Sequence, residues 1–345
     1  MTTARPPILS TVGDPQEPAW RGLMEASHPR PGRPLLSLLE LWARSYRREA
    51  LVLRGSVTAR DLYRDLVFAL ALRHRRRRPR TLVTDATWEP GSRTLAARLP
   101  WLQPHLPQIA RLMIRALDGP HVHYAVLSQE ERAVFARTWG VPVERVVFTP
   151  FPMTLYAEYD RQTHDGGYLF AGGNSLRDYD LLAAALAGSG YEAHVASRWT
   201  PPTPVPGLHA RPTSHDEFTE LLLGCRAMVL PLERSSRSAG QQTFLNAMVL
   251  GKPVIVTDAM GVRDYVEDGV TGVVVPPDPT RLREALDHVM DPANAEHYRR
   301  MGARARAEVL GRRMPEHYVQ HLVAALGYGP APQPAEPAEP AEPPT

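Results

Sequence analysis

The chain has 345 residues, of which 43% are hydrophobic and 22% are charged. These ordinary values exclude a wholly disordered protein, and the length allows two domains with separate cores. No apolar run reaches the roughly 18 residues of a membrane-spanning helix, and the N-terminus lacks the features of a signal peptide, so we expect a cytoplasmic protein. The formal net charge is only +3, and the single cysteine, Cys225, excludes an intrachain disulfide. No Cys/His cluster has zinc spacing and no pair of carboxylates stands out, so we expect neither a metal nor another cofactor.

Short apolar runs alternate with helical patterns through the first part of the chain. Strands are expected at 51–55, 81–85 and 124–128, and helices are expected at 61–72 and near 107–117. Strands separated by helices of this length are typical of the β–α–β units of a parallel sheet. The sequence therefore predicts a parallel α/β domain at the N-terminal end.

Arginines are concentrated in one short run, Arg73–Arg80, directly after the helix expected at 61–72. One interpretation is a solvated last turn, because cations are favourable at the C-terminal end of a helix. A second is peripheral contact with an anionic membrane surface, which basic clusters beside amphipathic helices often make. Nucleic-acid binding is a third, but the run has no interleaved aromatic residues, so we expect no nucleic-acid partner.

Prolines and glycines between residues 150 and 167 indicate a connection between domains. We therefore assign 1–155 to an N-terminal domain and 156–310 to a C-terminal domain. A helical pattern follows within 311–328. The last residues, 329–345, repeat Pro-Ala-Glu and cannot bury enough apolar area to fold, so we expect a disordered tail.

The most informative segment runs from 238 to 277. Small and polar residues at 238–240 lead into a helix that begins near Gln242 and ends at Gly251, and a short β-branched strand follows at 254–257. A loop of small residues at the start of a helix presents unpaired N–H groups and the positive end of the helix dipole. This arrangement suits a phosphate, and a pyrophosphate above all.

Motifs in and before this segment resemble a known enzyme family. They are Tyr168–Gly173, Asn246–Met248, Gly251–Asp258, Gly261, Asp268–Gly269, Thr271–Gly272 and Pro276–Asp278. They look like the large retaining bacterial family of two-domain (GT-B type) nucleotide-sugar glycosyltransferases with a group-1 type C-terminal domain. With companion motifs at 126–150, the resemblance covers roughly residues 120–310.

The resemblance implies an α/β fold with two Rossmann-like doubly wound domains that face a central cleft. It implies a transferase that moves a sugar from a nucleotide-diphosphate sugar to a glycan, lipid-linked or small-molecule acceptor, with retention at the sugar, as in polysaccharide biosynthesis. Such an enzyme would be cytoplasmic, or peripheral at the inner face of the membrane. In similar enzymes the last helix, here within 311–328, returns toward the N-terminal domain.

The resemblance also implies which residues hold the donor. The glycines of the first turn would allow a close approach of the diphosphate, and Arg177 would neutralise it; an ion pair with Asp178 or Asp180 is the alternative role of this arginine. Arg211 falls where the family holds the nucleotide base. The full set of expected donor-binding residues is Gly172, Gly173, Arg177, Arg211, Ser238, Gly240, Gln241, Gln242, Thr243 and Asn246.

Two positions depart from the family pattern. The family carries two glutamates with seven residues between them, one for the sugar and one for the ribose, and these positions are Ser238 and Asn246 here. Asn246 can still bond a ribose hydroxyl, but without the stronger charge-assisted contact of a carboxylate. Gln241 and Gln242 could replace the sugar contacts, or could simply be a polar helix start. The alternative function is a non-catalytic relative that binds a nucleotide-sugar or glycan as a partner subunit.

Asp85, at the end of the strand expected at 81–85, and Trp88 and Glu89 just after it are candidates for the acceptor side. Asp85 is the candidate catalytic residue, which would orient or deprotonate the acceptor hydroxyl if the enzyme inverts; a turn at the strand end is the alternative. Trp88 could stack on a sugar face, and Glu89 adds a second carboxylate. In a retaining transferase the leaving phosphate can take the proton, so no side-chain base is required.

Overall fold

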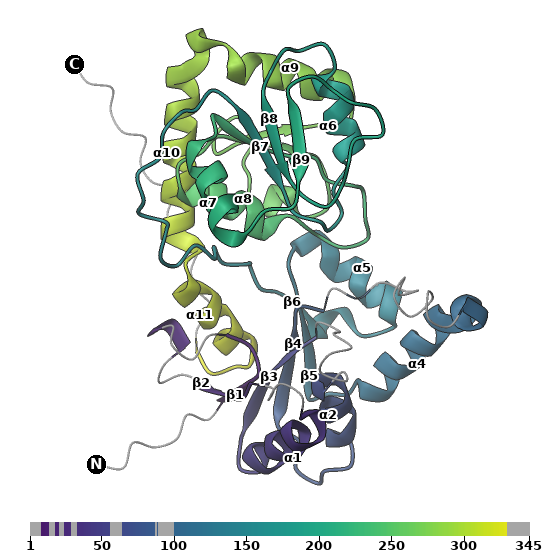
Figure 1. The fold of residues 1–345 in the computed structure, drawn as a ribbon. Coiled ribbons are helices and arrows are strands. Elements are labelled where there is room, and N and C mark those ends of the chain that lie inside the picture. The colour runs from purple at the N-terminus through teal and green to yellow at the C-terminus, as the bar shows by residue number, and fades with distance from the viewer. Residues whose placement is uncertain are drawn as a thin grey trace. The chain divides into compact units, whose positions relative to one another are not determined.

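The computed structural model describes residues 8–13, 18–20, 24–28, 33–55, 64–86, 88 and 100–329. These residues form two compact units: one contains the residues up to Pro150 together with those from Tyr318 onward, and the other contains Phe151–His317. Each unit is built on a six-stranded sheet (Figure 1). All strand pairs are parallel, which confirms the predicted α/β class with two doubly wound units. Apart from Gly329, the Pro-Ala-Glu tail lies outside the described residues.

The sheet of the first unit has the order β2-β1-β3-β4-β5-β6. Its central strands pair over five residues, from Ala50 with Arg80 to Arg54 with Thr84. The strands are short aliphatic runs, as expected where both faces of a parallel sheet are covered. Their bounds are β1 (Ile8–Ser10), β2 (Met24–Ala26), β3 (Ala50–Arg54), β4 (Arg80–Thr84), β5 (Val122–Val126) and β6 (Val146–Phe148).

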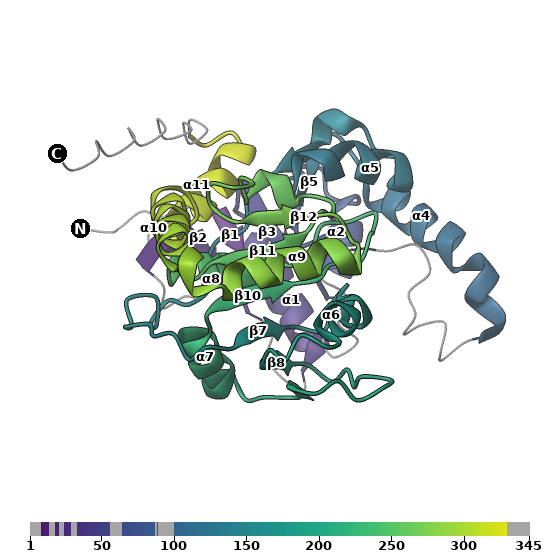
Figure 2. The same cartoon turned by 90° about the horizontal axis from the view of Figure 1, so that it is seen from above.

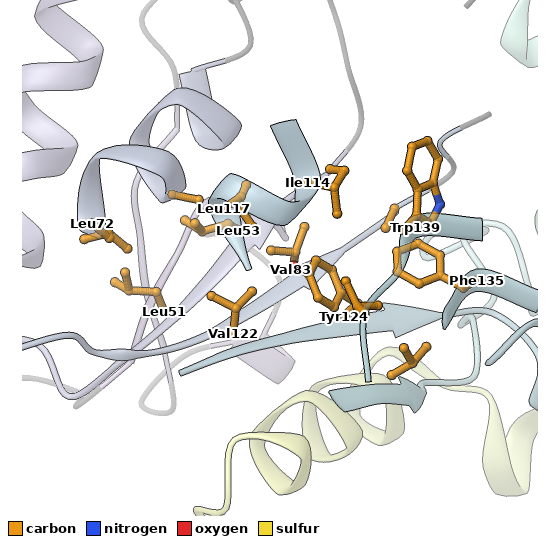
Figure 3. Close-up of a cluster of buried hydrophobic side chains, with 14 of the residues drawn as sticks. Leu51, Leu53, Leu72, Val83, Ile114, Leu117, Val122, Tyr124, Phe135 and Trp139 are labelled. Atoms are coloured by element: carbon orange, nitrogen blue, oxygen red, sulfur yellow. The ribbon is translucent and has the colours of Figure 1, made fainter. Parts of the chain in front are cut away.

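Helices cover both faces of this sheet. Leu51 and Leu53 of β3 point into a core shared with α1 (Pro34–Ser45), α2 (Arg64–Leu72), α4 (Leu106–Leu117) and α5 (Gln129–Trp139), and Figure 3 shows this cluster. The alternating residues Ala50 and Val52 point to the other face, where α11 (Pro315–Ala325) packs. The described part of this unit also contains the short 3-10 helices η1 (Pro18–Trp20), η3 (Pro100–His105) and η4 (Val143–Arg145).

The sheet of the second unit has the order β12-β11-β10-β7-β8-β9, which Figure 2 shows from β12 to β8. From β7 the chain adds β8 and β9 on one side, and then adds β10, β11 and β12 on the other. The strand order therefore reverses between β7 and β10. The bounds are β7 (Leu169–Gly172), β8 (Ala193–Ala196), β9 (Leu208–Arg211), β10 (Ala227–Leu230), β11 (Val254–Thr257) and β12 (Val273–Val275).

The helices of the second unit begin where the sequence provides caps. Asp178, Ser214 and Asp278 each accept a hydrogen bond from a backbone N–H in the first turn of the helix that follows. One helix has only a glycine at this position, Gly240 before α8. The helices are α6 (Tyr179–Leu186), α7 (His215–Gly224), α8 (Gln241–Val249), α9 (Pro279–Met290) and α10 (Ala295–Arg312), with 3-10 turns η5 (Val262–Asp264) and η6 (Pro292–Asn294).

Candidate functional site

The reversal of strand order in the second unit marks the first place to look for a ligand. In open parallel sheets, ligands bind outside the carboxyl ends of the two strands between which the order reverses. Here the loops that follow β7 and β10 meet at that place. Asp178 N–H donates to Pro231 O at 3.0 Å, and Glu233 N–H donates to Leu176 O at 3.1 Å. The two loops are therefore joined into one surface at the strand ends.

Arg177 is the central cation of this surface. Its Nε donates to Gly172 O at 3.1 Å, its Nη1 to Ser175 O at 2.6 Å, and its Nη2 to the hydroxyl of Thr243 at 3.2 Å. Burial lowers the pKa of Arg177, but a guanidinium remains charged at any ordinary pH. In the described part of the chain, its nitrogens bond two carbonyls and a hydroxyl but no carboxylate. The arginine is thus held in place by neutral groups, with its positive charge uncompensated.

Gly172 and Gly173, in the first turn, are each required for a different structural reason. A Cβ on Gly172 would run into the ring of Phe218, so this glycine serves packing. Gly173 has a φ of +103°, and a Cβ there would lie 2.8 Å from Arg177 Nη2. Three residues further, Leu176 has a φ of +54°, which is rare for a leucine and is typical of functional loops.

The N-terminus of α8 has no side-chain cap. Gly240, at the N-cap with φ +93°, has no side chain to bond the first turn, so part of the positive helix end is left without a side-chain cap. Gln241 is only 4% exposed, and its Nε2 has no hydrogen-bond partner among the described residues. Because buried amide groups are nearly always bonded, this orphaned donor indicates a missing partner. Thr243, in the same turn, is the residue that Arg177 contacts.

A second arginine, Arg237, adjoins this site and was missed by the sequence analysis. Its Nη2 donates to the hydroxyl of Ser175 at 3.0 Å, in the loop after β7. Because Arg177 also bonds Ser175, the two guanidinium groups lie near each other, and the charge of Arg237 lowers the pKa of Arg177. The sequence signal is Arg-Ser-Ser-Arg at 234–237, in the loop between β10 and α8. Two cations beside a helix N-terminus suit a diphosphate.

One of the expected donor residues, Arg211, lies apart from this cluster. Arg211 ends β9 at the edge of the sheet, where it pairs with the carboxylate of Glu217; that bond raises the pKa of Arg211. Strands β7 and β8 separate β9 from β10. Gln242 is exposed on α8, whereas Ser238 is buried in the preceding loop.

Asn246 is bonded to the segment that leads into the second unit. Its Oδ1 accepts from the backbone N–H of Thr154 at 2.8 Å, and its Nδ2 donates to the Thr154 hydroxyl at 3.0 Å. The side chain is buried, and both ends of its amide have partners. Asn246 therefore ties α8 to residue 154 in this structure.

The candidate acceptor residues lie in the first unit. Asp85 follows β4 with a φ of +54°, and burial raises the pKa of its carboxyl although Arg54 opposes this rise. Strained backbone and a raised carboxyl pKa are both frequent at catalytic sites. Trp88 donates from its indole N–H to Gly55 O at 2.6 Å. Its ring packs against Tyr124, Phe135 and Trp139, and Glu89 lies outside the described residues.

A buried ionic network lies at the strand-order reversal of the first unit, between β1 and β3. Asp65 bonds the Thr11 hydroxyl and accepts from Arg54 N–H at 2.9 Å and from Arg64 Nε at 2.8 Å. Arg64 is buried, and its Nη1 has no partner among the described residues. The sequence analysis did not single out this network, because an Arg-Asp pair at a helix start is most often exposed.

Two other buried polar groups have structural roles. Lys252 donates from Nζ to His164 O and to Cys225 O, both at 2.7 Å. Burial raises the pKa of the Cys225 thiol to about 12, so it remains protonated and is not a nucleophile.

Among the residues described, no three His, Cys, Asp or Glu side chains gather as metal ligands would. Within the same ranges, no helix has the length and apolar character needed to cross a membrane.

Comparisons with known proteins show which family and which folds the chain resembles. Residues 210–308 match the family model "Glycosyl transferases group 1". Similar solved structures include sucrose-phosphate synthase from Thermosynechococcus elongatus, with 14% identity, a TM-score of 0.60, and coverage of 90% of this chain and 85% of that one. A glycosyltransferase from Rickettsia africae gives 10% identity, a TM-score of 0.59, and coverage of 92% and 89%. Anabaena HepE in complex with UDP gives 13% identity, a TM-score of 0.56, and coverage of 93% and 98%.

No curated protein matches the sequence. At these identities the solved structures establish the fold, and the matching family model lies on the unit that carries Arg211, α8 and β11. The predicted resemblance is confirmed. Residues 210–308 match the group 1 glycosyl transferases, and the chain has the two-domain GT-B fold of the similar solved structures.

Proposed function

We propose that the chain transfers a sugar from a nucleotide-diphosphate sugar, and that the donor diphosphate binds at the strand-order reversal of the second unit. The observation that carries this proposal is the placement of Arg177 and Arg237 beside the N-terminus of α8, which lacks a side-chain cap. Two fixed cations and a positive helix end match the charge and size of a diphosphate. They also stabilise the negative charge that develops as the diphosphate leaves.

The proposed donor contacts follow from this placement. Arg177, Arg237 and Thr243 face the diphosphate with the first amides of α8, and Gly173 leaves room for the Arg177 guanidinium. The orphaned Nε2 of Gln241 donates to the donor, and Ser238, Gly240 and Gln242 flank the sugar. Arg211 is proposed to approach the nucleotide base from the edge of the sheet. Asn246, whose amide is engaged by Thr154, positions α8 rather than the ribose.

The reaction is proposed to retain the configuration of the sugar and to need no metal. In a retaining transfer the leaving diphosphate oxygen accepts the proton of the acceptor hydroxyl, so positioning and charge stabilisation supply most of the rate. Asp85, whose carboxyl has a raised pKa, would instead serve as the base in an inverting reaction.

UDP-glucose is the first donor to test, because solved structures of HepE contain UDP, UDP with glucose, and UDP-glucose. The acceptor is proposed to be a glycan, a lipid-linked saccharide or a small molecule, in bacterial polysaccharide synthesis at the cytoplasmic side. Peripheral membrane contact through Arg73–Arg80 would bring the enzyme close to a lipid-linked acceptor.

Calorimetric titration of the full chain with UDP-, GDP- and ADP-sugars tests the proposal. Saturable binding of at least one of these donors is expected, followed by slow release of the nucleoside diphosphate when an acceptor is supplied. Failure of folded protein to bind any of them would refute the proposal. Binding without release, across a panel of acceptors, would favour a non-catalytic partner subunit.

A further inference from the structure

Three helices of the first unit lie side by side on one face of its sheet. Helix α1 packs on α2, and α2 packs on α4, and all three contribute to the same core cluster (Figure 1). Their inward sides are occupied by residues such as Leu41, Phe68 and Ile114. Their outward sides therefore form one continuous surface, which we call the α1–α2–α4 face.

This face exposes large apolar side chains on every one of its helices. Leu35 and Leu39 of α1 are 72% and 65% exposed, and Leu112 and Met113 of α4 are 63% and 55% exposed. Val67 of α2 lies between them in the layer and is also exposed. Leu35 and Leu39 are four residues apart and share one side of α1, as Met113 and the exposed Ile109 do on α4. Single exposed leucines are ordinary, but a group on adjoining helices marks an interaction surface.

Aromatic residues lie at the ends of these helices. Trp101, in η3 just before α4, is 72% exposed, and Tyr46, just after α1, is exposed as well. Tyrosine and tryptophan are enriched where proteins meet the boundary between lipid and water, because their rings combine apolar and polar parts.

Several exposed arginines accompany this face. Arg73, Arg76 and Arg77 follow α2 and are exposed, and the exposed residues Arg111 and Arg115 lie on α4, which contains no acidic residue. None of these five arginines forms an ion pair with a carboxylate within the described ranges. Arg75 differs, because its guanidinium stacks on the ring of Trp42 at 4.0 Å.

We propose that the α1–α2–α4 face docks on an anionic lipid membrane. The exposed leucines, Met113 and Trp101 would enter the outer part of the bilayer, while the arginines would contact the phosphates of the headgroups. Arginine binds phosphate with two parallel hydrogen bonds, which favours this contact over a diffuse attraction. The proposal extends the basic run Arg73–Arg80 to a surface that the structure assembles from three helices.

Charge distinguishes a membrane from a second copy of the chain as the occupant. In a symmetric dimer through this face, the arginines of one copy would meet those of the other, and like charges across an interface are unfavourable. An anionic bilayer offers complementary charge together with an apolar layer just below it. The docking does not depend on the proposed donor site, so each can fail without the other.

Vesicle flotation of the full chain tests the proposal, in phosphatidylcholine vesicles with and without phosphatidylglycerol. Binding is expected only when phosphatidylglycerol is present, and it should weaken as salt increases. Replacing Arg76→Glu and Arg77→Glu together should weaken binding by about tenfold or more. Replacing Leu112→Gln and Met113→Gln together should weaken it by about tenfold, because less apolar area enters the lipid.

Matched variants on the second unit control for charge and hydropathy. Arg300→Glu with Arg304→Glu changes two exposed arginines of α10, and Leu310→Gln changes an exposed leucine of the same helix. Both should leave vesicle binding unchanged. Equal binding to neutral vesicles, or an equal loss in the control variants, would overturn the proposal. So would an effect of the Leu112 and Met113 changes on oligomeric state by light scattering without any effect on vesicle binding. Thermal unfolding of each variant separates these results from misfolding.

Discussion

The guanidinium of Arg177 donates from Nη2 to the hydroxyl of Thr243 at 3.2 Å, and this bond joins the loop after β7 to the first turn of α8. The two residues are 66 positions apart in the chain. Their contact places at the positive end of a helix a guanidinium to which no described carboxylate is bonded. The proposed donor site depends on this arrangement.

Replacing Arg177→Ala should weaken donor binding by about 1.5–3 kcal/mol, because the diphosphate loses a charge-assisted contact. Calorimetric titration with the best-binding nucleotide-sugar measures the change. Arg299→Ala provides the matched control, since this exposed arginine of α10 is bonded to Glu296, far along the chain from the donor site. An unchanged affinity in the Arg177 variant would place the phosphate site elsewhere.

Replacing Asn246→Ala should lower the free energy of unfolding by about 1–2 kcal/mol, because the N–H of Thr154 loses its acceptor. Donor affinity of the folded variant should change little if Asn246 acts only by holding α8. Thr154→Val removes the hydroxyl but keeps the N–H, so a smaller loss of stability is expected. Chemical denaturation and calorimetry give the two quantities; a large loss of affinity with unchanged stability would mean that Asn246 contacts the donor directly.

Replacing Asp85→Asn should raise the free energy of unfolding at neutral pH. Burial raises the pKa of this carboxyl above its ordinary value of 3.8, so the folded protein bears a cost for the charged form. The gain should be present at neutral pH and should vanish as pH falls toward 3.8, where both states are protonated. Asparagine tolerates the positive φ at this position. Denaturation across this pH range checks the sign.

The same variant tests the stereochemical proposal. A retaining enzyme should keep its transfer rate within about tenfold in Asp85→Asn, whereas loss of a general base typically costs a hundredfold or more. The anomeric configuration of the product, read by nuclear magnetic resonance, decides independently. An inverted product together with a large loss of rate would assign Asp85 as the base.

The free energy of unfolding of the first unit should decrease in mild acid because of His123. Burial and the charges of Arg145 and Arg80 lower its pKa below the ordinary value of 6.5, with Asp118 opposing them. The unfolded chain then binds the proton more readily than the folded one, so stability falls as pH drops below 6.5. Unfolding titrations from neutral to mildly acidic pH should show this slope, and His123→Gln should flatten it. A slope unchanged in that variant would assign the effect to other groups, such as His121.

The sequence predicted the elements best where local chemistry sets their ends. The strand expected at 254–257 has those bounds as β11, because Gly251 and Pro253 stop the preceding helix and four β-branched residues follow. Helix α8 begins at Gln241, one residue before the expected start. In both cases the deciding residues are adjacent in the chain.

Features that depend on distant segments could not be predicted in this way. Arg237 reaches Ser175 only because the loops after β10 and β7 meet at the strand-order reversal. The sequence analysis explained the glycine at position 172 by a close approach of the ligand. In the structure, the ring of Phe218 fills the space beside it. Trp88 was expected to be available to a sugar, yet its ring packs among other aromatic side chains such as Phe135, and its role at the acceptor stays a prediction.

A crystal structure with a bound nucleotide-sugar tests the central claim most directly. The account predicts that diphosphate oxygens lie within hydrogen-bond distance of the Arg177 guanidinium and of the first backbone N–H groups of α8, with the Gln241 amide bonded to the donor. A donor bound elsewhere on the chain, with Arg177 and the start of α8 free of phosphate, would contradict it.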